Sequence, residues 1–151
     1  MDRLDILQNV VTENERHQQF MALKLSKEAF DFAFHLHYRI WEKYHNTAAA
    51  YRIAWLLIAQ GEYMDEVGWL YMKRAALNGH PYAAFDLFWK GFNPLMLAFD
   101  VDTLQWLKAA VLKGHNLASQ CYILLSDADR FTPERFVLEK AINNLEKETA
   151  S

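Results

Sequence analysis

Two short segments of this 151-residue chain are near copies of one another. Residues 73–83 read KRAALNGHPYA and residues 108–118 read KAAVLKGHNLA, so Lys, Ala, Leu, Gly, His and Ala recur in the same order. The two glycines, Gly79 and Gly114, are separated by 114 − 79 = 35 residues. A period of this length is typical of arrays of helical hairpins, in which each unit packs on the next. We therefore expect an all-α chain built from stacked hairpins.

Helix breakers and caps predict where the helices lie. No glycine precedes Gly61 and no proline precedes Pro81, so only capping residues divide the first 60 residues. Thr12, three residues before Glu15, has the capping-box spacing, and Ser26 is a second candidate N-cap. The expected helices cover about 3–11, 13–25, 27–45, 47–60, 65–78, 82–90, 102–113 and 116–125, with Asp65 capping the fifth, and a last one follows Thr132 and Pro133.

The repeated helices alternate between two types, which we call A and B. A helices begin near Ala49, Ala83 and Ala118, and B helices end at Gly79 and Gly114. The expected fold is a short α-solenoid of two to three antiparallel helix hairpins in a single domain, 1–151. Residues 1–46 and 126–151 lack the repeat, and atypical end units shield the apolar flanks of such arrays. We therefore expect N-terminal capping helices over 1–46, repeats over 47–125, and a C-terminal capping helix and tail over 126–151.

The repeat resembles the Sel-one-like family of helical repeats, which are related to tetratricopeptide repeats. That family pairs an A helix of pattern A-x-x-x-L-G-x-x-Y with a B helix of pattern A-x-x-W-x-x-K-A-A-x-x-G-H. The A pattern is matched first by Ala49, Ile53, Ala54 and Leu57, and then by Ala83 and Leu87. The first copy of the B pattern is matched by Gly68, Tyr71, Arg74, Ala75, Ala76, Gly79 and His80. The second copy is matched by Trp106, Ala109, Ala110, Gly114 and His115. The chain departs from the family in lacking a G-x-G-V-x-x-D hairpin loop and in placing Phe88 and Ile123 where the A helix has a small residue. The resemblance implies a scaffold that binds proteins along a concave face lined by A helices.

The amino-acid composition limits the kinds of binding partner and the cellular compartment that we expect for this protein. The net charge of −3 offers no basic stripe for nucleic acid. Cys121 is the single cysteine and has no intramolecular disulfide partner, and no segment reaches the roughly 18 apolar residues of a membrane span. We expect a protein in the reducing cytoplasm that binds neither nucleic acid nor membrane.

Nothing in the sequence forms a recognisable catalytic or metal-binding set. His80 and His115 occupy equivalent positions at helix ends, where an imidazole can bind the last carbonyl groups. His35 and His37 point in different directions on a helix, and no His or Cys spacing matches a zinc site. Cys121 has no base partner in the pattern. The expectation is a non-enzymatic protein without metal or cofactor.

The candidate binding residues come from aligning the A helices. The alignment places Tyr51, Phe85 and Gln120 in one row, Arg52, Asp86 and Cys121 in a second, and Trp55, Trp89 and Leu124 in a third. Tyr, Trp and Arg are enriched at binding hot spots, so Tyr51, Arg52, Trp55, Phe85, Asp86 and Trp89 are predicted to bind a protein partner. The alternative is that the N-terminal helices pack over Trp55 and Trp89 and bury them.

The hairpin loop over residues 92–99 is apolar where such turns are usually polar. Leu95, Leu97 and Phe99 either fold back onto the core or form an exposed patch for a partner or a second copy of the chain, and a homodimer through this loop is one option.

Two classes of function remain open at this stage. The leading one is a protein–protein interaction module that binds a partner of unknown identity, such as an adaptor or an immunity protein that neutralises a toxin. The other is a small enzyme or ligand-binding protein whose aromatic N-terminal helices form a pocket.

Overall fold

The computed structural model describes residues 3–61, 63–93 and 99–126. Within these ranges the chain is all-α and forms seven helices: α1 (Arg3–Met21), α2 (Lys27–Tyr44), α3 (Thr47–Gln60), α4 (Met64–Leu77), α5 (Pro81–Gly91), α6 (Val101–Leu112) and α7 (Asn116–Ser126). Consecutive helices from α3 to α7 pack on one another in antiparallel pairs. The prediction of an all-α chain is therefore confirmed, while the expected C-terminal helix lies outside the described residues.

The repeated Gly-His segments end the B helices α4 and α6 in the same way. Gly79 and Gly114 have positive φ angles of 95° and 83°, which glycine adopts without a Cβ penalty. At the end of α4 the amide of His80 donates to the carbonyl of Ala75 at 3.0 Å, and that of Gly79 donates to Ala76 at 3.0 Å. This pair of bonds is the Schellman motif, and α6 repeats it with bonds from His115 to Ala110 and from Gly114 to Val111. The predicted ends of both helices are confirmed.

Three predicted helix starts differ in outcome. Ser26 caps α2 as expected, because its side chain accepts the Ala29 amide. Thr12 does not start a helix, because α1 runs without interruption from Arg3 to Met21. A capping box in a segment without glycine or proline has no element to stop the preceding helix, so one long helix forms. Asp65 is also not an N-cap: that position is Tyr63, without a side-chain bond.

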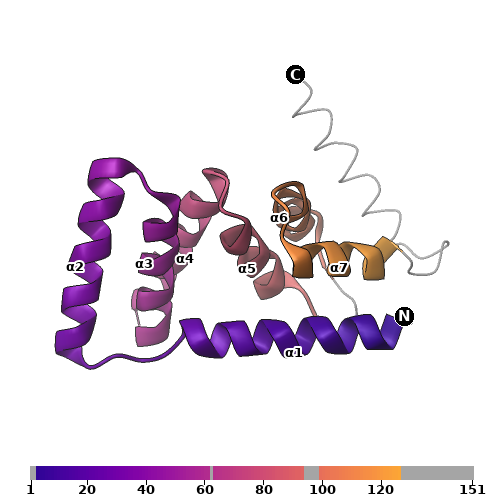
Figure 1. Ribbon diagram of the computed structural model, residues 1–151, viewed down its shortest axis with the longest axis horizontal. Coiled ribbons are helices and arrows are strands. Elements are labelled where there is room, and N and C mark those ends of the chain that lie inside the picture. The colour runs from indigo at the N-terminus through magenta and orange to yellow at the C-terminus, as the bar shows by residue number, and fades with distance from the viewer. Residues whose placement is uncertain (1–2, 62, 94–98, 127–151) are drawn as a thin grey trace, which may run out of the picture.

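The two N-terminal helices take different positions on the array. α2 packs along α3, at the left end of the molecule in Figure 1. It has no fully buried residue and rests on the half-buried side chains of Phe30, Phe34 and Trp41. α1 instead crosses below α5 and reaches α7, with further contacts to α3. The residues before the repeats therefore cover two separate surfaces.

The α3–α4 hairpin depends on a close approach at Gly68. A Cβ atom at this position would lie 2.8 Å from the carbonyl oxygen of Ala54 and 2.8 Å from Cγ1 of Ile58. Gly68→Ala should therefore lower the free energy of unfolding by about 1–3 kcal/mol through overpacking, although alanine gains up to about 1 kcal/mol in helix propensity. Urea denaturation measures the change, and Leu70→Ala, at an exposed position two residues later, serves as the control. A Gly68→Ala variant more stable than the natural protein would contradict the close approach.

Candidate functional site

Most of the predicted binding residues on α3 and α5 are buried. Tyr51 and Trp55 are 7% and 4% exposed, and Phe85 and Asp86 are 1% exposed each. Trp55 is therefore part of the core, where it contacts Trp69 of α4 and Asp86 of α5. The alternative that the N-terminal helices bury Trp55 stays a prediction. None of these four side chains is open to a partner in this conformation.

The remaining predicted residues lie nearer the surface. Arg52 and Trp89 are half-buried; Arg52 contacts Met21 of α1, with Nη1 and Sδ 4.0 Å apart, and Trp89 packs on Phe85 and Phe92. Phe99 is half-buried against the core. Phe92 is buried as well, so both described ends of the apolar loop fold inward, while Leu95 and Leu97 lie outside the described residues.

Asp86 joins residues that the alignment had placed in three different rows. Its Oδ2 accepts the hydroxyl of Tyr51 at 2.7 Å and the indole Nε1–H of Trp55 at 3.0 Å. The carboxyl group is buried, and burial raises its pKa to about 7 despite these two bonds. Burial and the neighbouring Asp86 likewise raise the pKa of Tyr51. In the described structure no cation pairs with Asp86, so its charge is stabilised by hydrogen bonds alone.

A histidine of α1 extends this network. Nε2 of His17 lies 2.8 Å from the Tyr51 hydroxyl oxygen. Because the single hydroxyl proton of Tyr51 goes to Asp86, the imidazole must donate and the hydroxyl oxygen must accept. The bonds therefore run from His17 on α1, through Tyr51 on α3, to Asp86 on α5. Sequence reasoning did not single out His17, because nothing in the local pattern of α1 indicates its distant partner.

Aromatic and imidazole rings form a continuous cluster around this network, with stacked, tilted and edge-on contacts. The ring of His80 lies 4.4 Å from that of Tyr51, and the ring of His115 lies 4.6 Å from Phe85 and 4.5 Å from Tyr82. His17 completes the set at 5.4 Å from Tyr82. These distances are within the range of favourable ring contacts. The aromatic character predicted for the A-helix rows thus serves packing between repeats.

His80 and His115 act at the starts of helices and not at their ends. Nδ1 of His80 accepts the Ala83 amide, and Nδ1 of His115 accepts the Ala118 amide, both at 3.2 Å. The expectation that their imidazoles bind the last carbonyl groups is therefore wrong. The backbone amides of the glycine and of the histidine bind those carbonyls, and the imidazole is the N-cap of the following A helix. An accepting Nδ1 must be unprotonated. Burial accordingly lowers the pKa of His80, and burial with neighbouring His17 and His80 lowers that of His115 to about 4.

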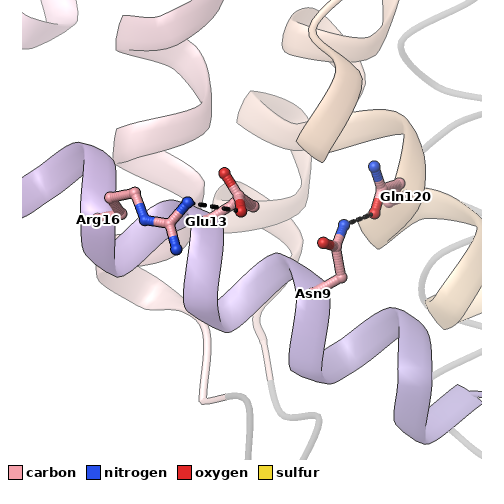
Figure 2. A network of polar contacts seen from close by, with 4 residues as sticks. All are labelled: Asn9, Glu13, Arg16 and Gln120. Atoms are coloured by element: carbon pink, nitrogen blue, oxygen red, sulfur yellow. Dashed lines mark hydrogen bonds and ion pairs between the residues drawn. The ribbon is translucent and has the colours of Figure 1, made fainter.

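Between α1 and α7 lies a polar groove of about 390 Å³. It is lined by side chains of α1, α5 and α7 and by His115, the residue before α7. The lining residues of the three helices are Asn9, Glu13, Asn14, His17, Tyr82, Asn116, Leu117 and Gln120. Figure 2 shows two polar contacts of its lining residues: Asn9 donates a hydrogen bond to Gln120 at 2.5 Å, and Glu13 pairs with Arg16, which does not line the groove, at 3.3 Å. Asn14 differs from these paired side chains because it is 1% exposed. Neither its Nδ2 nor its Oδ1 has a hydrogen-bond partner in the described structure.

The described side chains include neither a metal-binding cluster nor an activated thiol. No group of three or more His, Cys, Asp or Glu side chains in the described ranges is arranged to hold a metal ion. Cys121 is buried, and burial raises the pKa of its thiol to about 12, which leaves little nucleophilic thiolate. No helix in residues 3–61, 63–93 or 99–126 has the length and apolar character to cross a membrane.

Comparison with protein-family models, with curated proteins and with solved structures gives no match. The resemblance to Sel-one-like repeats stays a prediction that depends on the two Gly-His segments.

Proposed function

We propose that this protein is a non-enzymatic protein-binding module, a short α-solenoid of the Sel-one-like type. The partner would bind the side of α3, α5 and α7 that α1 contacts through Tyr51, Arg52, Tyr82 and Gln120, which we call the A-helix surface. The supporting observation is that this surface already holds a helix, α1, supplied by the same chain. Helix-in-groove binding is a recurrent mode of protein recognition.

Within this class, a dedicated adaptor or an immunity protein for a toxin suits a small array. One observation favours the alternative of a ligand-binding protein: the polar groove beside Asn14 has a volume within the usual range of small-molecule sites. The two classes differ in what should bind the purified chain.

Affinity capture with the full-length chain, followed by mass spectrometry and reconstitution, tests the proposal. We expect one protein to form a complex of defined stoichiometry. Arg52→Ala and Tyr82→Ala should each weaken that complex by about tenfold or more, because Arg and Tyr are typical hot-spot residues. Leu112→Ala, at an exposed position on the B helix α6, is the matched control and should leave the affinity unchanged.

Two results would contradict the proposal. The first is a reconstituted complex that Leu112→Ala weakens while Arg52→Ala and Tyr82→Ala do not, since the partner would then bind elsewhere. The second is the absence of a protein partner together with a small molecule that raises the melting temperature of the natural chain but not of a Tyr82→Ala variant. That outcome would favour the ligand-binding class.

A further inference from the structure

We propose that α1 is an internal substitute for the partner, and that a helix of the partner protein displaces it from the A-helix surface. This inference depends on the proposed function and adds to it the kind of partner and the regulation of the site. It starts from the way in which α1 is attached.

The apolar contact between α1 and the array is small, and Ile6 and Met21 contribute to it as half-buried side chains packed against the core. Among the described side chains of α1, Val10 is the only apolar one that is fully buried. The other buried side chain is Asn14, whose amide nitrogen and oxygen are both unpartnered in the described structure. An unsatisfied buried amide loses its bonds to water and gains none in return. Asn14 therefore opposes the docking of α1 at the centre of its contact surface.

The groove beside α1 and the segment that joins α1 to α2 are both compatible with a helix that can leave the array. The polar groove of about 390 Å³ is lined by both α1 and α7, so part of the α1 surface that faces α7 borders open space. Residues 22–26, which join α1 to α2, form no helix, and four of the five are exposed. α1 can therefore leave without moving α2, which packs on α3.

The contacts of α1 define the helix that would replace it. Positions 10, 14 and 17 follow the i, i+4, i+7 spacing of one helix face. The partner should present apolar residues in place of Val10 and Asn14. In place of His17 it should present a hydrogen-bond donor, His, Lys or Arg, since the Tyr51 hydroxyl has given its proton to Asp86 and can only accept. The fitting partner is thus an amphipathic helix with one donor on its apolar face.

Synthetic peptides of residues 3–21 supply the probe, one with the natural sequence and one with Asn14→Leu, each carrying a fluorescent label. Fluorescence anisotropy with the full-length chain should show that the Asn14→Leu peptide binds about tenfold tighter or more, because it removes the unsatisfied amide. A peptide that combines Asn14→Leu with His17→Ala should lose affinity. The full-length Asn14→Leu variant should bind every peptide more weakly, since its own α1 competes better.

Hydrogen exchange on the natural chain shows where the peptide binds. We expect the amides of α1 to lose protection when the Asn14→Leu peptide binds, while those of α3, α5 and α7 keep theirs. Equal affinity of the two peptides, or binding that leaves α1 protected, would overturn the displacement. A captured protein partner that binds through Arg52 and Tyr82 but leaves α1 protected would overturn it too, while the proposed function would stand.

Discussion

Trp55→Ala should lower the free energy of unfolding by about 3–5 kcal/mol, the usual cost of removing a buried aromatic side chain. The indole is 4% exposed, packs 6.4 Å from the ring of Trp69, and donates Nε1–H to Asp86. Alanine would leave a cavity and remove one of the two hydrogen bonds that the buried carboxyl group receives. In a domain of this size the melting temperature should fall by roughly 10 °C or more.

Two variants separate the contributions to this loss. Trp55→Phe keeps much of the aromatic ring but removes the hydrogen-bond donor. The free energy of unfolding that this variant loses relative to the natural chain therefore reports mainly the bond to Asp86. Trp89 is half-buried on the next A helix, so Trp89→Ala should lower the free energy of unfolding by clearly less than Trp55→Ala does. Calorimetry on the three variants measures the differences. A Trp55→Ala protein that melts within about 2 °C of the natural chain would show that the indole is not part of the core.

Local patterns in the sequence predicted the ends of several helices well. The ends of α4 and α6 depend on Gly79 and Gly114, and a positive φ angle at these positions is a property of the residue itself. The boundaries of α3 and α5 follow in the same way from Gly61 and Pro81. Each of these signals acts over one or two turns, and the sequence therefore contains it in full.

Contacts between distant segments were not predicted, for a physical reason. Tyr51 and Asp86 are 35 residues apart and His17 is 34 residues from Tyr51, so no local periodicity relates them. Trp55 carries the residue type of a binding hot spot, but the same type fills cores, and only the position of the neighbouring helices separates the two uses. The course of α1 across the A helices was missed because, among its described side chains, Val10 is the only apolar one that is fully buried, and this leaves a weak amphipathic pattern.

The pH dependence of stability combines the buried carboxyl group of Asp86 with buried histidines that act in the opposite direction. The pKa of Asp86 is raised from its usual 3.8 to about 7, so the unfolded chain loses this proton first and stability falls as pH rises from about 4 to 7. The pKa of His115 is lowered from 6.5 to about 4, so the unfolded chain binds this proton first and stability falls as pH drops from 6.5 to 4. These two effects cover nearly the same interval with opposite sign, but burial also lowers the pKa values of His17 and His80, which act in the direction of His115. We therefore expect the natural protein to lose stability as the pH drops through this interval.

Asp86→Asn should remove one of these opposing effects. The amide oxygen can still accept from Tyr51 and Trp55, while the buried group no longer ionises. The variant should therefore gain stability relative to the natural chain as pH rises, by about 2–4 kcal/mol between pH 4.5 and pH 8. Urea denaturation at a series of pH values measures this difference directly. If the difference stays constant with pH, or changes in favour of the natural chain, Asp86 ionises normally in the folded protein, and the bonds from Tyr51 and Trp55 outweigh its burial.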